Sequence, residues 1–229
     1  MRTVSIQGIS GSGKTTLGAA LAARLGVAHL ETDALVHGPD WTETPDADLR
    51  AAIEEFMRAD GWVIDSDYRR KLGTLVLERA DTVVWLDFPL HVCLRRLWGR
   101  TIPRIRHQQP LWNDNRESWR SAFWGWESLF VYAIRKHVGH RRRFTELLAR
   151  PELGHLRVVR LRSPAEVERW LRTIPAEAEA PIAADPLDEM YARGEIVRGT
   201  PRDDPVFPDE PLPGTATSEE IVSEGRDED

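Results

Sequence analysis

The chain has 229 residues, of which 41% are hydrophobic, so it is long enough to bury one good core and need not form two domains. Its single cysteine, Cys93, excludes an internal disulfide framework and a paired-thiol metal site. No apolar run approaches the roughly 20 residues that span a bilayer, and the start of the chain does not resemble a signal peptide. We therefore expect a soluble cytoplasmic protein that does not insert into membranes.

The net charge of −6 is unevenly distributed along the chain. Residues 176–229 hold 4 Arg against 16 Asp and Glu, a net charge of −12, so the remainder carries 27 basic against 21 acidic residues, a net charge of +6. The acidic segment also holds seven of the 15 prolines, a composition that cannot offset chain entropy by burial. We predict a folded domain over residues 1–174 and a disordered tail over 175–229, with room for a short helix at 186–196.

Short apolar runs alternate with helical periods through the first 174 residues. Strands are predicted at residues 3–7, 28–31, 62–65, 82–88 and 156–161. Helices are predicted at 14–25, from a Thr44-Pro45 cap to about Met57, at 89–99 and at 163–174. Apolar strands separated by helices indicate an α/β doubly wound fold, with a parallel sheet covered on both faces. Only residues 100–145 break the rhythm.

The first loop fits the phosphate-binding pattern G-x-x-x-x-G-K-[ST] from Gly8 to Thr15. Glycines let successive N–H groups point at a phosphate, and the helix that follows adds its positive dipole end. Lys14 would reach the β and γ phosphates of a nucleoside triphosphate, and Thr15 would offer a hydroxyl to Mg²⁺. The residues expected to bind ATP here are Gly8, Ser10, Gly11, Ser12, Gly13, Lys14, Thr15 and Thr16.

An aspartate stands near the end of each of the next three predicted strands: Asp33, Asp65 and Asp87. Ligands of open parallel sheets lie off the carboxyl ends of the strands. Asp65 could therefore hold Mg²⁺, and Asp33 could accept a hydrogen bond from an acceptor hydroxyl or base. Strand-end aspartates also cap helices, and we expect Asp87 to shape the turn before Pro89. Trp41, in the loop after Asp33, is a candidate for stacking on a substrate.

Arginines gather in and before the irregular section. Arg96 and Arg100 lie one helical turn apart, and eight more arginines follow them: Arg104, Arg106, Arg116, Arg120, Arg135, Arg141, Arg142 and Arg143. Phosphoryl transfer needs cations around the transferred group and closure against water. We therefore predict a lid at about 100–145, with Lys14, Asp65, Arg96 and Arg100 as catalytic residues. A basic solvated helix pair or a nucleic-acid surface is the alternative.

The same section is rich in aromatic residues. Trp119, Phe123, Trp126 and Phe130 follow one another at helical spacings. We interpret them as a packing stripe, with base stacking open for one or two of them.

Several stretches, among them "GISGSGKTTLGAALAARLG", "HLETDALVHGPDW", "GWVIDSDYRR" and "LWNDNRESW", resemble small bacterial phosphate-loop proteins related to adenylate kinase, the DNA topology modulation (FlaR-like) group. The resemblance covers residues 1–174. It implies a nucleoside-monophosphate-kinase fold with a five-stranded parallel sheet, an acceptor-binding region after strand two and a lid after strand four. It also implies ATP as donor, with Arg162 near its adenine.

The stretch from Asp65 to Arg69 stands where adenylate kinases read Asp-Gly-Phe-Pro-Arg. The resemblance implies that Arg69, with Tyr68 beside it, binds the acceptor, but the central Gly-Phe-Pro is missing. Residues 32–60 also lack an early arginine to clamp AMP, since Arg50 and Arg58 come late. An acceptor other than AMP is therefore equally open.

Two functions of different classes fit the sequence. The first is an ATP-binding phosphotransferase that moves the γ-phosphate of Mg·ATP to a small acceptor, acting as a monomer or weak dimer. The second is a regulatory or interaction protein with slow ATPase activity and no small acceptor. Direct nucleic-acid binding through the basic lid is a third reading, and no base-reading motif supports it.

Overall fold

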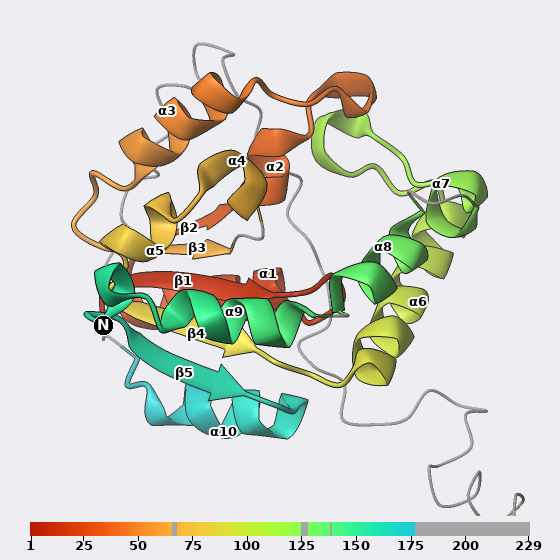
Figure 1. The fold of residues 1–229 in the computed structure, drawn as a ribbon. Coiled ribbons are helices and arrows are strands. Elements are labelled where there is room, and N and C mark those ends of the chain that lie inside the picture. The colour runs from red at the N-terminus through yellow and green to blue at the C-terminus, as the bar shows by residue number, and fades with distance from the viewer. Residues whose placement is uncertain (66–67, 125–127, 138, 177–229) are drawn as a thin grey trace, which may run out of the picture.

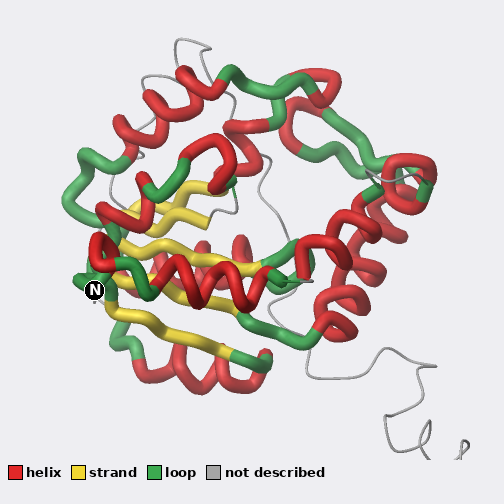
Figure 2. Tube along the Cα trace, viewed as in Figure 1, coloured by secondary structure: helices red, strands yellow, loops and turns green. Residues whose placement is uncertain are grey.

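The computed structural model describes residues 1–65, 68–124, 128–137 and 139–176. Figures 1 and 2 show a sheet with helices on both of its sides and a group of helices beyond one end of it. The disorder predicted for 175–229 and the helix at 186–196 fall outside the described residues, apart from Pro175 and Ala176. Trp126 of the aromatic stripe is also outside them.

Five parallel strands form one sheet in the order β2-β3-β1-β4-β5. They are β1 (Thr3–Gly8), β2 (Ala28–Glu31), β3 (Trp62–Asp65), β4 (Thr82–Leu86) and β5 (Arg157–Leu161). The α/β prediction is confirmed, and each strand begins within one residue of its predicted start. After β3 the chain crosses to the other side of β1, so the carboxyl end of β1 is a switch point at which a crevice forms.

The four predicted helices are present, and the described chain adds six that were not predicted. The helices are α1 (Lys14–Leu25), α2 (Thr32–Val36), α3 (Asp46–Phe56), α4 (Arg69–Leu72), α5 (Leu75–Arg79), α6 (Leu90–Arg106), α7 (Trp119–Phe123), α8 (Leu129–His137), α9 (His140–Leu148) and α10 (Pro164–Thr173). The predicted ones are α1, α3, α6 and α10, and the added ones are α2, α4, α5 and α7–α9. Three single 3-10 turns complete the described chain: η1 (Pro39–Trp41), η2 (Trp112–Asp114) and η3 (Pro151–Leu153).

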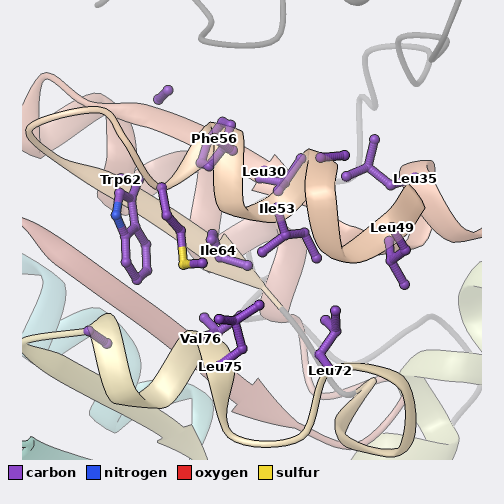
Figure 3. Packing of buried hydrophobic residues seen from close by; sticks show 14 of the residues in the cluster. Leu30, Leu35, Leu49, Ile53, Phe56, Trp62, Ile64, Leu72, Leu75 and Val76 are labelled. Carbon is purple, nitrogen blue, oxygen red and sulfur yellow. The ribbon is translucent and has the colours of Figure 1, made fainter. Parts of the chain in front are cut away.

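The two faces of the sheet pack against different helices because side chains alternate along each strand. Val4, Ile6 and Val84 pack with Leu17 of α1 and Val167 of α10. On the opposite face two clusters form, one under α2–α5 and one under α9. Figure 3 shows the larger of these, in which Leu30, Ile64 and Trp62 of the sheet meet Leu35, Leu49, Ile53, Phe56, Leu72, Leu75 and Val76. The sheet is thus buried on both sides and holds its strand ends rigidly.

Two helix boundaries differ from prediction. The hydroxyl of Thr44 does not cap α3 but donates to the carbonyl of Leu35 at 2.5 Å, and Pro45 takes the cap position. This hydrogen bond ties the loop before α3 back to α2. α6 runs past its predicted end at residue 99 and through Pro103 to Arg106.

Candidate active site

The loop between β1 and α1 has the backbone that its glycines predict. Gly11 and Gly13 have φ angles of 81° and 90°, in the left-handed region that side chains rarely adopt. A Cβ on Gly11 would also lie 2.4 Å from the carbonyl oxygen of Cys93 on α6, so α6 packs directly on the loop. α1 begins at Lys14 with no acidic residue in its first turn. The positive end of its dipole therefore faces the loop, as an anion site requires.

Two cations lie over this loop. Lys14 Nζ is 3.5 Å from the carbonyl oxygen of Ile9, and Arg96 Nη1 of α6 donates to the carbonyl of Ser12 at 3.2 Å. Burial lowers the pKa of Arg96 from its usual value, but a guanidinium remains charged at neutral pH. Gly8 ends β1, Ser10 lies in the loop, and Thr15 and Thr16 lie in the first turn of α1. The structure thus joins Arg96 to the predicted phosphate-binding residues.

Glu31, at the end of β2, is a residue that the sequence reasoning missed. The hydroxyl of Thr15 donates to Glu31 Oε1 at 3.1 Å, and the indole N–H of Trp112 donates to Glu31 Oε2 at 3.1 Å. Glu31 stands two residues before Asp33, and the sequence alone does not show which of the two carboxylates contacts the phosphate loop. The acidic side chain of Glu31 at a strand end, immediately before the Thr-Asp pair, was the available signal.

Asp65 lies beside Glu31 in the strand register and is 3% exposed. Its Oδ1 accepts from the backbone N–H of Thr32 at 3.3 Å, and His29 Nε2 lies 3.7 Å from its Oδ2, an ion-pair distance rather than a hydrogen bond. Burial alone would raise the pKa of Asp65, but His29, then Lys14 and Thr15, outweigh burial and lower it. Asp65 is therefore ionised at neutral pH.

The oxygens of Thr15, Glu31 and Asp65 together fit a small hard cation. Mg²⁺ is bound by one or two carboxylates plus phosphate oxygens rather than by a full protein cage. Asp65 Oδ2 is buried without a hydrogen-bond partner among the described residues. Over the same part of the chain there is no group of three or more His, Cys, Asp or Glu side chains that could hold a metal by themselves. The donor set thus suits a metal that arrives with a nucleotide.

Asp33 lies on α2 within a chain of hydrogen bonds. The hydroxyl of Tyr68 donates to Asp33 Oδ1 at 2.7 Å, and His37 Nε2 lies 3.1 Å from the same hydroxyl oxygen. Since the single Tyr68 proton goes to the carboxylate, His37 must donate from Nε2 to Tyr68. The structure thus brings Asp33 and Tyr68 into contact and adds His37 to them; their predicted role in binding an acceptor stays a prediction.

A contact between η1 and η2 closes this side of the site. Asn115 Oδ1 accepts from the backbone N–H of Trp41 at 2.9 Å, and Asn115 Nδ2 donates to the carbonyl of Gly38 at 2.9 Å. The ring of Trp112 stacks on His37 with 5.8 Å between centroids. Trp41 itself meets the edge of His37 at 5.4 Å and is 41% exposed. Its predicted stacking on a substrate stays a prediction.

Consecutive residues of both turns have left-handed backbones without being glycine. They are Asp40 and Trp41 in η1 and Asn113 and Asp114 in η2, with φ angles between 54° and 59°. Such conformations persist where the surroundings hold them and often mark binding sites. Here each strained turn is held by the other.

The remaining predicted site residues are more dispersed. Arg69 Nη2 lies 3.3 Å from His140 Nδ1, and its guanidinium lies 5.2 Å from the centroid of the Phe144 ring. Arg100 follows Arg96 on α6, and its Nε is buried without a hydrogen-bond partner among the described residues. Arg162 is exposed after β5, where its backbone N–H donates to Glu166 at 2.7 Å. No described contact joins Arg162 to the phosphate loop.

Asp87 and several arginines of the predicted lid form ion pairs that hold elements of the fold together or lie within one helix. Asp87 is 6% exposed and accepts hydrogen bonds from Arg141 at 3.0 Å and from Arg160 Nε at 2.9 Å. This ion pair fixes α9 and β5 to the end of β4. Arg104 is buried, 3.9 Å from Glu117, and Arg142 pairs with Glu146 within α9. These arginines therefore do not all converge on one phosphate position.

The aromatic stripe packs, although not on one helix. Phe123 of α7 stacks on Trp119 at 5.7 Å and on Phe130 of α8 at 4.8 Å between centroids. Trp98 of α6 meets the edges of Phe123 and Phe130 at 5.3 Å and 5.8 Å. Because α7 ends at Phe123 and Phe130 belongs to α8, these aromatic side chains do not line one helix but form a cluster between α6, α7 and α8.

No protein-family model matches the chain. The shikimate kinase of Synechococcus elongatus is 29% identical over 135 residues, which cover 50% of this chain and 71% of that protein. The shikimate kinase of Persephonella marina is 28% identical over 142 residues, which cover 54% of this chain and 80% of that protein. The chain is similar to small phosphate-loop kinases. The broad part of the resemblance drawn from the sequence is therefore confirmed.

Among solved structures, the shikimate kinase of Acinetobacter baumannii in complex with shikimate aligns with a TM-score of 0.44 and 16% identity, covering 76% of this chain and 93% of that one. Within the described residues, none of the helices is long and apolar enough to cross a membrane.

Proposed function

We propose that the protein is an ATP-dependent phosphotransferase that moves the γ-phosphate of Mg·ATP to a hydroxyl of a small acceptor. The observation that carries this proposal is the placement of Asp33, hydrogen-bonded to Tyr68, two residues from Glu31, which contacts Thr15 of the phosphate loop. A hydrolase needs only the loop and a water. A half-buried carboxylate, held by a hydrogen bond on one oxygen close to the phosphate loop, is what a hydroxyl acceptor needs.

In this proposal the residues of the chain divide the chemistry among them. The N–H groups of Gly8–Thr16 and Lys14 bind the donor phosphates, and Arg96, with Arg100 behind it on α6, offsets charge that develops on the transferred group. Asp33 accepts the proton of the acceptor hydroxyl. Thr15, Glu31 and Asp65 would hold Mg²⁺, which supplies charge neutralisation on the donor when bound.

Tyr68 and His37 orient the carboxylate of Asp33. Because Tyr68 donates to Asp33 Oδ1, the other oxygen, Oδ2, is proposed to face the substrate. Trp112 and Trp41 are proposed to line the same site. Arg69 is proposed to bind an anionic group of the acceptor. Shikimate, a hydroxy acid, is the first acceptor to try because curated relatives are named shikimate kinases. Membership of the DNA topology modulation group, ATP as donor and a cytoplasmic location are further parts of the proposal.

The test is ADP release by the full chain with Mg·ATP, alone and with shikimate, other small acids, sugars, nucleosides and nucleoside monophosphates. We expect one acceptor to accelerate release well above the rate with ATP alone. Asp33→Asn should remove that acceleration by about 10²–10⁴-fold, the usual size of general-base catalysis, and should leave the acceptor-independent rate and ATP affinity unchanged. Arg142→Ala, a change to an exposed arginine paired within α9, is the matched control.

A second function is favoured by one observation, the exposed aromatic side chains on the lid. A uniform slow release of ADP with every acceptor would contradict the phosphotransferase. It would leave a nucleotide-dependent interaction protein, whose partner binding should then disappear in Lys14→Ala.

A further inference from the structure

The lid carries an apolar groove of about 570 Å³ lined by Trp98, Trp119, Arg120, Phe123 and Trp124. Three of its tryptophans are open to solvent, with Trp98 54%, Trp119 52% and Trp124 81% exposed. A contiguous exposed apolar patch with polar residues at its rim is typical of an interaction site. Its place on α6 and α7, beyond the end of the sheet, separates it from the Asp33 site (Figure 1).

The charge around the groove limits what can cover it. Residues 100–137, which leave out α9 over the sheet, hold 7 Arg and Lys against 3 Asp and Glu, a net charge of +4. The net charge of residues 1–175 is +6, so this section accounts for most of it. A second copy of the same surface would be repelled, whereas an acidic, partly apolar segment would be attracted.

The chain itself contains such a segment. Residues 176–229 have a net charge of −12, and within them Leu187, Met190 and Tyr191 recur at the spacing of one helical face, flanked by acidic residues. The residues between Ala176 and Leu187 can extend over about 36 Å, the size of a small domain. Covalent attachment also raises the local concentration of the segment to the millimolar range.

We propose that the acidic C-terminal segment of the same chain, through residues 186–197, docks in the aromatic groove of the lid. The apolar side chains cover Trp98, Trp119 and Trp124, and the acidic residues face Arg120 and the arginines around it. Trp98 lies between Arg96 and Arg100 on α6, so docking bears on the helix that also contacts the phosphate loop. This contact goes beyond the proposed phosphotransfer and does not depend on it.

A nitroxide on the full-length chain tests this contact. The label is attached at Ala192→Cys, and Cys93 stays unlabelled because it is fully buried. The indole N–H signals of the tryptophans are assigned by single Trp→Phe changes. We expect the signals of Trp98, Trp119 and Trp124 to lose most of their intensity, while those of Trp62 and Trp85, buried in the sheet, keep theirs.

Two further samples decide the source of the effect. In a mixture of isotope-labelled protein without nitroxide and nitroxide-labelled protein without isotope, the signals should stay intact; equal broadening there would mean a second copy and would overturn the proposal. Leu187→Ser with Tyr191→Ser should restore the signals in the single-chain sample, and the matched pair Ile221→Ser with Val222→Ser should not. Broadening that survives the first pair would reduce the contact to charge attraction outside the groove and overturn it.

Absence of selective broadening at any salt concentration also overturns the proposal. A single-stranded oligonucleotide that shifts the three groove signals under those conditions would then assign the groove to nucleic acid.

Discussion

The sheet and the groove on α6 and α7 bury their tryptophans to very different extents. Trp62 and Trp85 in the sheet are 1% and 2% exposed, whereas Trp98 and Trp124 at the groove are 54% and 81% exposed. Burial from water is the main stabilising contribution to folding, so the sheet holds the fold together and the groove adds little to it. The exposed tryptophans of the groove can instead contribute binding energy when a ligand or partner covers them. Substitutions in the two regions should therefore be separable by what they change.

The largest expected effect is on stability and belongs to the sheet side. Phe56 of α3 is fully buried in the cluster of Figure 3, so Phe56→Ala should lower the free energy of unfolding by about 3–5 kcal/mol. Trp124→Ala removes a larger side chain from the lid but should change it by less than about 0.5 kcal/mol. Urea unfolding of both variants measures this, and equal losses would erase the distinction between the regions.

Next comes an effect on turnover without an effect on stability. Lys14→Ala should lower ADP release by about 10²–10³-fold, the size found when one preorganised transition-state contact is lost. The urea midpoint should change little, since within the described residues Lys14 makes one long hydrogen bond, to the carbonyl of Ile9 at 3.5 Å, beside a charge interaction with Asp65. Arg142→Ala is the matched cationic control. Retained activity in Lys14→Ala would contradict the assignment of the loop.

A third effect concerns pH at the junction of the two regions. Burial raises the pKa of the Cys93 thiol from 9.0 to about 11. Between pH 9 and 11 the thiol of the unfolded chain ionises while the thiol of the folded protein does not. The contribution of Cys93 to the free energy of unfolding is therefore fully present below pH 9, and about 2–3 kcal/mol of it is lost as pH rises through 11. Cys93→Ala should flatten that part of the stability profile relative to the parent. Rapid alkylation of native Cys93 at pH 8 would contradict the raised pKa.

The smallest expected effect is on Mg²⁺ dependence and comes from Trp112, which contacts Glu31 at the site. Trp112→Phe keeps a ring for His37 but deletes the N–H that bonds to Glu31. We expect the Mg²⁺ concentration for half-maximal ADP release to rise about five-fold, corresponding to roughly 1 kcal/mol for one hydrogen bond. Trp119→Phe, in the exposed groove, should leave it unchanged. A parallel shift in both variants would indicate a general loosening of the lid.

The two regions also differed in how much the sequence could predict. The strands could be located because short apolar runs are local signals, and all of them but β2 contain β-branched residues. The phosphate loop could be located because its glycines meet a local requirement for left-handed backbone angles. Glu31, His37 and Trp112 were missed because their roles arise from hydrogen bonds and stacking between β2, α2 and η2, and Glu31 and Trp112 are 81 positions apart in the sequence. The lid was predicted as a region, but its broken helices and left-handed turns depend on contacts that spacing does not encode.

The carboxylate of Glu31 has one oxygen on Thr15 and the other on Trp112. A cation that binds the first oxygen withdraws negative charge from the second and weakens its hydrogen bond to the indole, whose ring stacks on His37. Thermodynamic linkage makes such an effect reciprocal. A molecule beside His37 that is favoured by this change favours the cation by the same factor, and Glu31 is one side chain through which the two halves of the site are joined.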